Sequence, residues 1–337
     1  MIDFSRATSS RDAHLQKAWR KVPNVAPIRQ AELPGPAVLT VVALLVPEET
    51  PVEQVSLGVE YPATGIISYA QNREDVLLWR ALHDVENGFY LDVGAQDPTH
   101  HSVTRAFYDR GWRGVNIEPA TGCFQKLCAA RPRDLTLQVA LGDREGWATL
   151  HEFPDTGLST LVGDLAASHR ALGFSSVERT VPILILTRVW ERFVKGEVHF
   201  LKIDVEGYER QVLSGADLKK IRPWIILAEA TEPMTSEATW EEWEEILLRA
   251  RYQPIHFDGL NRWYLAEERS HLKPRFEAPP NVFDQFQLAA MVSLQERAAK
   301  AEFTIKQMQS SASWRITAPL RKVRDALAAT LWLICGR

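Results

Sequence analysis

Three acidic residues each follow an apolar segment in the first half of the chain. Asp92 precedes Gly94 and Ala95, Glu118 ends the next apolar segment, and Asp143 follows a third. A glycine after a strand lets backbone N–H groups approach a ligand, and an acid after the second strand can accept both ribose hydroxyls of a nucleoside. Asp143 could accept the exocyclic amine of adenine. The series predicts a nucleoside-binding site; the alternative is a set of turn and helix-capping acids.

A second pair of carboxylates lies further along the chain. Asp204 and Glu206 follow the apolar segment 200–203 and are separated by one residue. Residues i and i+2 of an extended segment point the same way, so both side chains could face one pocket. There they could position an ammonium group, bind a divalent metal or act as a general base. Lys202 lies on the same side by parity, so an ion pair with Asp204 is the structural alternative.

Histidines and cysteines give weaker signals. Asp97, His100 and His101 follow the first turn. Adjacent histidines make poor joint metal ligands, so we expect a capping Asp and two loop histidines. Cys123 and Cys128 lie five residues apart in a helical segment, which favours thiols packed in the core or on a helix face. The chain has three cysteines, too few for a disulfide framework, which fits a reducing compartment.

Alternating strands and helices must position these groups. Short apolar segments bounded by glycine recur between segments of helical pattern, which indicates βαβ units and a parallel sheet covered on both faces. The last two strands flank Asp258 and Gly259 and predict an antiparallel hairpin at the sheet edge. The predicted strands span 89–93, 114–118, 135–141, 198–204, 224–229, 252–257 and 262–265. The predicted helices span 73–84, 104–110, 122–131, 207–213 and 239–251.

Three segments fall outside this alternation. Residues 1–64 are rich in proline and predict an N-terminal extension with a short helix at 12–21 and one strand at 37–46. The connection 144–197 exceeds normal loop length and predicts a lid or substrate loop. After the core domain, 65–275, two prolines mark a joint and residues 276–337 form a tail. The tail is strongly helical over 284–309, broken at 310–313, and amphipathic and basic over 314–335.

Composition and charge exclude few classes of protein. The 337 residues include 39 Lys and Arg and 43 Asp and Glu, for a net charge of −4. This balance is typical of a globular protein and gives no electrostatic case for nucleic-acid binding. The apolar runs 37–46 and 326–335 have about ten residues each, where a membrane span needs roughly 20. The N-terminus lacks the apolar core of a secretory signal, so we expect a cytoplasmic protein.

Several blocks, in order, match a known family. They are residues 68–75, 89–95, 102–104, 111–119 and 200–207. On these blocks the chain, from about residue 68 to 232, resembles the FkbM-type S-adenosylmethionine-dependent methyltransferases. The resemblance implies a Rossmann-like class I methyltransferase fold, α/β, with six parallel strands and one antiparallel strand. Members of the family are associated with O-methylation of hydroxyls on sugars, polysaccharides and macrolide-type natural products.

The resemblance also implies roles for individual residues. Asp92, Gly94 and Ala95 match the turn that binds S-adenosylmethionine, Glu118 the ribose ligand and Asp143 the adenine-side acid. Asp204 and Glu206 match the signature beside the methionine moiety and the acceptor, and are the candidate catalytic residues. His100 and His101 fall in a variable stretch and receive no role. The general base and the use of a divalent metal stay open.

The tail carries a second, shorter resemblance. Residues 313–321 resemble a tail found after methyltransferase and glycosyltransferase domains in bacterial glycan clusters, which suggests surface-polysaccharide biosynthesis. Residues 296–337 hold eight basic and three acidic residues. Basic residues beside the apolar run 326–335 suit an interfacial helix on anionic lipid at the inner face of the membrane. The alternative is a helix used for packing or self-association.

The predicted function is S-adenosylmethionine-dependent O-methylation of a hydroxyl on a glycan or small molecule. One alternative is a nicotinamide-dependent oxidoreductase, which the incomplete G-x-G-x-x-G pattern disfavours. The other is a non-catalytic or regulatory module of a membrane-associated glycan assembly, which the retained Asp92, Glu118 and Asp204 disfavour.

Overall fold

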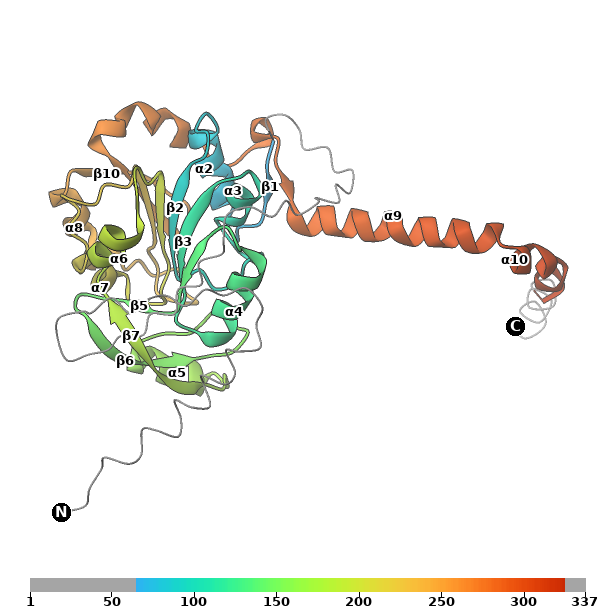
Figure 1. Ribbon diagram of the computed structural model, residues 1–337, viewed down its shortest axis with the longest axis horizontal. Helices are drawn as coiled ribbons and strands as arrows, with labels where there is room; N and C mark the ends of the chain where they lie inside the picture. The colour runs from blue at the N-terminus through green and yellow to red at the C-terminus, as the bar shows by residue number, and fades with distance from the viewer. Residues whose placement is uncertain (1–64, 325–337) are drawn as a thin grey trace, which may run out of the picture. The chain divides into compact units, whose positions relative to one another are not determined.

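The computed structural model describes residues 65–324. The helix predicted at 12–21, the strand predicted at 37–46 and the apolar run 326–335 lie outside the described residues. The element labels below are those of Figure 1.

A seven-stranded sheet forms the centre of the domain (Figure 1). Its order is β10-β11-β9-β8-β2-β3-β4. Strand β11 is antiparallel to both β9 and β10, and the other neighbours pair in parallel. The predicted six parallel strands and one antiparallel strand are therefore confirmed. The strands are β2 (Phe89–Val93), β3 (Arg113–Ile117), β4 (Leu135–Leu137), β8 (Phe200–Ile203), β9 (Ile225–Glu229), β10 (Tyr252–Phe257) and β11 (Asn261–Ala266).

The predicted hairpin β10–β11 does form one edge of the sheet, but with a detail that the sequence did not show. Strand β11 passes inward, between β10 and β9, so that β10 is the outermost strand and runs parallel to the rest. The central strands β8 and β9 are buried along their whole length. Continuous apolar strands of this kind require cover on both faces.

Helices supply this cover. In Figure 1, α6, α7 and α8 lie to one side of the strands, and α3 and α4 to the other. A large apolar cluster joins the sheet to α2 through side chains that include Leu77, Phe107, Trp112, Phe200 and Trp263. The helices are α2 (Glu74–Leu82), α3 (Arg105–Asp109), α4 (Thr121–Ala130), α6 (Leu186–Phe193), α7 (Glu209–Ser214), η1 (Trp240–Glu242) and α8 (Glu244–Arg249).

The long connection after β4 contains strands and helices and is not one long loop. The predicted strand 135–141 divides: β4 stays in the main sheet, while β5 (Ala140–Leu141) joins a second sheet of order β5-β7-β6. Strands β6 (Gly146–Glu152) and β7 (Val177–Leu184) pair antiparallel and flank α5 (Gly163–Ala171). The prediction of a lid over all of 144–197 was therefore too broad, because β6, α5, β7 and α6 give most of the segment regular secondary structure.

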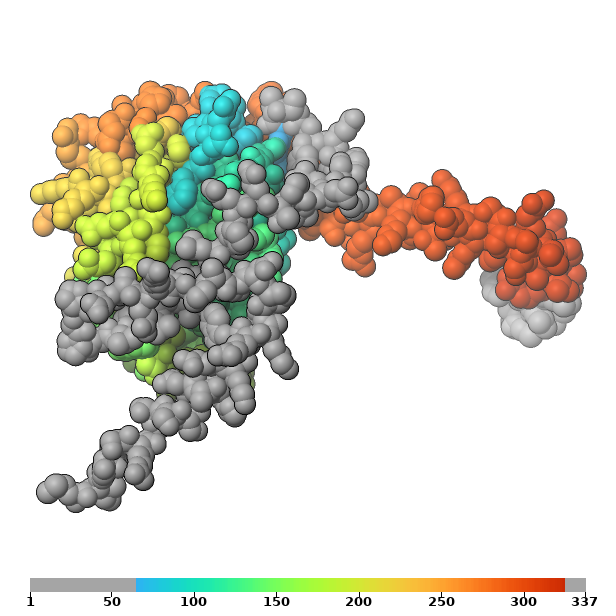
Figure 2. All heavy atoms as spheres, viewed as in Figure 1, coloured from blue at the N-terminus to red at the C-terminus, as the bar shows by residue number. Residues whose placement is uncertain are grey.

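The residues that follow β11 pack against the core domain before the chain continues into α9. Strand β12 (Gln287–Leu288) pairs in parallel with β1 (Ile67–Ser68). Helix η2 (Glu267–Phe276) packs beside α2, as the adjacent orange and cyan atoms in Figure 2 show. The Arg80 side chain of α2 donates to Asp284 in η3 (Val282–Asp284). Residues 276–288, which the sequence assigned to the tail, therefore contact the core domain.

Two helices follow. Helix α9 (Ala289–Ser310) lies within the predicted helix 284–309 apart from its last residue, and starts later because Leu288 is extended in β12. Ser311 is extended, and α10 (Ala312–Ile316) begins after it, so the predicted break is confirmed. Among residues 65–324, no helix is both long and apolar enough to cross a membrane.

Candidate functional site

A cavity of about 870 Å³ opens at the carboxyl ends of β2, β3, β8 and β9. From β2 the chain continues through β3 to β4 on one side, and it later returns to form β8 and β9 on the other side of β2. Ligands bind at such switch points in open α/β sheets. Six of the predicted site residues line this cavity: Asp92, Gly94, Ala95, Glu118, Asp204 and Glu206.

The turn after β2 requires glycine. Gly94 has φ +76°, and a Cβ atom there would lie 1.8 Å from the backbone oxygen of Asp204. Its N–H donates to the carbonyl of Ile117 at 3.0 Å. The turn is thus pressed between the ends of β3 and β8, where only a residue without a side chain fits.

Lys202 joins this turn to the end of β8. Its ammonium group donates to the Gly94 carbonyl at 2.6 Å and lies 3.5 Å from Asp92 and 3.3 Å from Asp204. Burial alone would lower the pKa of Lys202, but Asp204 and Asp92 raise it above its ordinary value. The ion pair between Lys202 and Asp204, which the sequence left as the structural alternative, therefore forms, although Asp204 still faces the cavity.

A buried arginine, Arg131, helps to hold Asp92 in place through the hydroxyl of Thr104. The Thr104 hydroxyl donates to Asp92 at 2.7 Å and accepts from Arg131 at 2.6 Å. Arg131 also donates to the Pro98 carbonyl at 2.6 Å and lies 3.9 Å from Asp134. Sequence reasoning missed Arg131, since it stands at the end of a helix like any surface arginine. The buried network holds the loop after β2 in one position.

Glu118 is held by the backbone. Its two carboxylate oxygens accept the N–H groups of Gln96 and Ala120, both at 2.8 Å. Burial raises the pKa of Glu118 to about 7. Each oxygen keeps a second lone pair, so the carboxylate can still accept two hydroxyl groups of a ligand.

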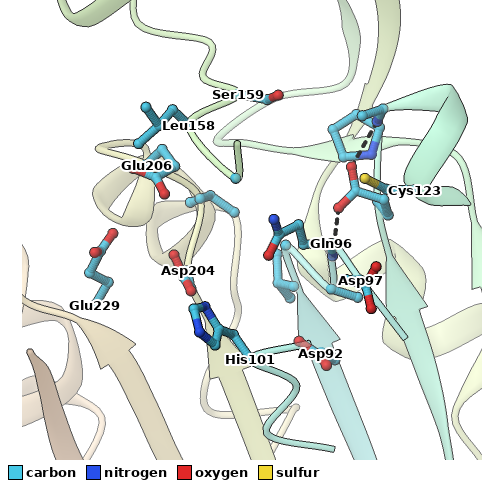
Figure 3. A pocket seen from close by; sticks show the side chains of 18 of the residues that line it. Asp92, Gln96, Asp97, His101, Cys123, Leu158, Ser159, Asp204, Glu206 and Glu229 are labelled. Atoms are coloured by element: carbon cyan, nitrogen blue, oxygen red, sulfur yellow. Dashed lines mark hydrogen bonds between the residues drawn. The ribbon is translucent and has the colours of Figure 1, made fainter. Parts of the chain in front are cut away.

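Three carboxylates meet on the other side of the cavity. Oxygens of Asp204, Glu206 and Glu229 lie within 4.8 Å of one another, and Figure 3 shows these side chains converging on one space. Burial and the neighbouring Asp204 raise the pKa values of both Glu206 and Glu229. Sequence reasoning missed Glu229, although it ends the strand predicted at 224–229. The missing information was that β9 is the neighbour of β8.

Asp143 lies apart from the other predicted ligands. Its side chain is exposed and does not line the cavity. The reason is the change of sheet after β4: Asp143 follows β5, in the small sheet, and not a strand of the main sheet. Its predicted contact with adenine is not supported by this position.

The histidines and cysteines are placed as follows. His100 and His101 line the cavity, with ring centroids 3.7 Å apart. Burial and the neighbouring His100 lower the pKa of His101, which keeps its imidazole neutral at pH 7. Cys123 and Cys128 are both half-buried free thiols of α4, and the thiol of Cys123 lines the cavity. Burial raises the pKa of Cys123 to about 11.

The cavity is strongly acidic. Nine carboxylates and two lysines, Lys126 and Lys202, line it. The carboxylates belong to Glu74, Asp92, Asp97, Glu118, Glu152, Asp155, Asp204, Glu206 and Glu229. This charge favours a ligand that carries positive charge and disfavours one that carries phosphate.

Comparison with known proteins identifies the domain. A family model described as "Methyltransferase FkbM domain" matches residues 92–254. The chain therefore contains an FkbM methyltransferase domain. The matched FkbM region begins at Asp92, in β2, and ends within β10. Two residues that line the cavity, Glu74 and Asn261, lie outside it and are hydrogen-bonded to each other at 2.9 Å.

The comparisons with solved structures and with curated proteins are less informative about this chain than the family match. The solved structure of a TehB-like SAM-dependent methyltransferase from Corynebacterium glutamicum ATCC 13032 Kitasato is similar, with a TM-score of 0.33 and 6% identity. The similarity covers 58% of this chain and 88% of that chain. A search of curated proteins found no significant match.

Proposed function

We propose that this FkbM methyltransferase transfers a methyl group from S-adenosylmethionine to a hydroxyl group of a sugar or glycan. The observation that carries the proposal is Glu118, buried at the end of β3 with both oxygens oriented by backbone N–H groups, next to the Gly94 turn. That arrangement suits the two hydroxyls of a ribose. The acidic cavity also suits a positively charged sulfonium.

The residues of the chain supply alignment and a proton acceptor. S-adenosylmethionine supplies an activated methyl group, which the acceptor oxygen displaces from sulfur in line. The Gly94 turn and Glu118 hold the nucleoside, and Asp204 lies where it can hold the ammonium group of the methionine moiety. The acceptor hydroxyl loses its proton to a group in the cavity; Asp204 and the neutral His101 can accept it.

Polar groups on the acceptor side support a hydroxylated substrate. Gln71, Thr231, Thr235 and Asn261 line the cavity near the end of β9 and offer hydrogen bonds of both senses. The resemblance of residues 313–321 to tails in bacterial glycan clusters points to polysaccharide biosynthesis. A nicotinamide-dependent oxidoreductase fits less well, because the pyrophosphate of its cofactor would face nine carboxylates.

Calorimetric titration with S-adenosylhomocysteine tests the proposal. We expect binding by the wild type, weakened by ~1–3 kcal/mol in Glu118→Ala because the ribose loses its acceptor. Glu86→Ala, an exposed carboxylate away from the cavity, is the matched control and should bind as the wild type does. Circular dichroism checks that Glu118→Ala is folded. Absence of binding by the folded wild type would contradict the proposal. A methyl-transfer assay against nucleotide sugars and oligosaccharides then identifies the acceptor.

A further inference from the structure

We propose that Asp204, Glu206 and Glu229 bind one divalent cation with oxygen preference, such as Mg²⁺, Mn²⁺ or Ca²⁺. The three carboxylates come from the ends of the neighbouring strands β8 and β9. Their oxygens lie within 4.8 Å of one another. Opposite ligands of such an ion stand about 4–5 Å apart, so one ion can contact all three carboxylates.

Glu229 supplies independent support for a ligand at this place. Only 9% of its surface is exposed, and its Oε2 atom has no hydrogen-bond partner among residues 65–324. A buried carboxylate oxygen without a partner is costly, and this one points into the space that Asp204 and Glu206 share (Figure 3). The hydroxyl of Thr231, two residues further on, is also buried without a partner and lines the same cavity.

The lysine at this site does not take the place of the cation. The ammonium group of Lys202 is engaged by the Gly94 carbonyl at 2.6 Å and by Asp92 at 3.5 Å. Of the three clustered carboxylates it pairs with Asp204 alone within the described residues, at 3.3 Å. Glu206 and Glu229 therefore share a cavity wall in which the described chain provides no positive partner.

The cation has a use if the proposed methyl transfer is correct. Bound at the ends of β8 and β9, it would lie on the side of the cavity that the polar acceptor residues line. A hydroxyl oxygen coordinated there would be oriented towards the methyl group and would lose its proton more easily. This role rests on the proposed function, whereas the binding of the cation does not.

Calorimetric titration of MnCl₂ into the full chain tests the site. We expect one Mn²⁺ per chain, with affinity reduced at least tenfold in Glu229→Gln and in Glu206→Gln. Glu237→Gln removes an exposed carboxylate of the nearby loop and should leave Mn²⁺ affinity unchanged. Thermal denaturation checks the fold of each variant. No Mn²⁺ binding by the wild type, or equal affinity in the Glu229→Gln variant, would overturn the site.

Titration with S-adenosylhomocysteine in the same samples separates the two proposals. Binding of S-adenosylhomocysteine without Mn²⁺ binding leaves the proposed function standing and removes the cation. Binding of Mn²⁺ without binding of S-adenosylhomocysteine supports the cation site and contradicts the proposed function. We expect Glu229→Gln to keep its affinity for S-adenosylhomocysteine, because Glu118 lies on the opposite side of the cavity.

A different observation, in α9, carries a second inference. Apolar residues recur along it at alternating intervals of three and four: Met291, Leu294, Ala298, Ala301, Ile305 and Met308. This is the a and d pattern of a two-stranded coiled coil. The four large side chains of the pattern are between 51% and 58% exposed, and no residue of α9 is buried. The apolar seam is therefore uncovered by the described chain.

We infer that the seam pairs with α9 of a second copy in a parallel coiled coil. Arg297 and Glu302 flank the seam at a g position and at the e position of the next heptad. Parallel pairing places the g residue of one helix against that e residue of its partner, which forms two Arg–Glu pairs. An antiparallel arrangement pairs g with g and would lose both. The tail self-association that the sequence left open as an alternative would thus acquire a specific register.

Sedimentation equilibrium of the full chain tests the pairing. We expect a dimer that Leu294→Glu and Ile305→Glu convert to a monomer. Phe303→Glu is the matched control: Phe303 is 61% exposed but lies at an f position, so the dimer should persist. Arg297→Glu should weaken the dimer, and adding Glu302→Arg should restore it. A monomeric wild type would overturn the inference. So would binding of α9 to phosphatidylglycerol vesicles that Leu294→Glu abolishes without changing the oligomeric state.

Discussion

At the scale of single residues, the site depends on contacts that only a few side chains can make. Gly94 lies where the backbones of β2, β3 and β8 come closest together. Lys202 and Arg131 are the buried cations that hold the acids of the turn, directly or through Thr104. Their role is to keep the cavity in a shape that a nucleoside can enter.

Gly94→Ala should lower the free energy of unfolding and abolish binding of S-adenosylhomocysteine. Positive φ alone costs roughly 1–2 kcal/mol for a residue with a Cβ atom, and the overlap with the Asp204 carbonyl adds to it. Urea denaturation and calorimetry measure the two effects. Gly111→Ala provides the control, because Gly111 has φ +91° but no atom near its missing Cβ. Equal losses in the two variants would show that crowding at Gly94 is unimportant.

At the scale of elements, the Arg80 side chain joins α2, near the start of the domain, to the segment 278–284, near its end. Arg80 of α2 donates to both oxygens of Asp284, at 2.7 and 2.6 Å. It also donates to the carbonyls of Ala278 and Pro279, at 2.6 and 3.0 Å. These bonds hold the segment that forms β12 against β1, which is a pairing of only two residues on each side. We therefore expect the arginine to contribute more to this attachment than the short strand pair does.

Arg80→Met should loosen residues 275–288 while leaving the cavity intact. The variant keeps the apolar stem of the side chain but leaves the partly buried Asp284 without its ion-pair partner. We expect this to lower the free energy of unfolding by about 1–3 kcal/mol. Hydrogen exchange measured by mass spectrometry should speed up in 275–288, and affinity for S-adenosylhomocysteine should not change. Arg113→Met, at an exposed position in β3, is the control. Unchanged exchange in 275–288 would assign the attachment to the strand pair instead.

At the scale of the whole molecule, the charge is unevenly distributed. Residues 296–337 carry a net charge of +5, so the residues before them carry −9. The acidic share includes the nine carboxylates of the cavity, which suit a cationic ligand. The basic share lies in and beyond α9. A coiled coil through α9 would place two such basic segments side by side and strengthen any contact with an anionic surface. Peripheral attachment at the inner face of the membrane stays a prediction.

The cavity belongs to the whole domain and not only to the FkbM match. Residues 92–254 provide the Gly94 turn, Glu118 and the cluster of Asp204, Glu206 and Glu229. Glu74 from α2 and Asn261 from β11 close the cavity from outside this range and bond to each other at 2.9 Å. Asp258 accepts the N–H of Asn261 at 2.7 Å and holds it in place. This wall of the cavity therefore depends on the last hairpin.

The sequence by itself determined the order of most strands and helices around the main sheet, the glycine turn and the acids at the strand ends. These are local properties, since periodicity, β-branched content and glycine act within a few residues. Tertiary structure alone decided which acids meet. Glu229 joins Asp204 because β9 pairs with β8, and Asp143 is left outside because the chain changes sheets after β4. Strand neighbours are chosen by packing between residues far apart in the chain, so no local pattern encodes them.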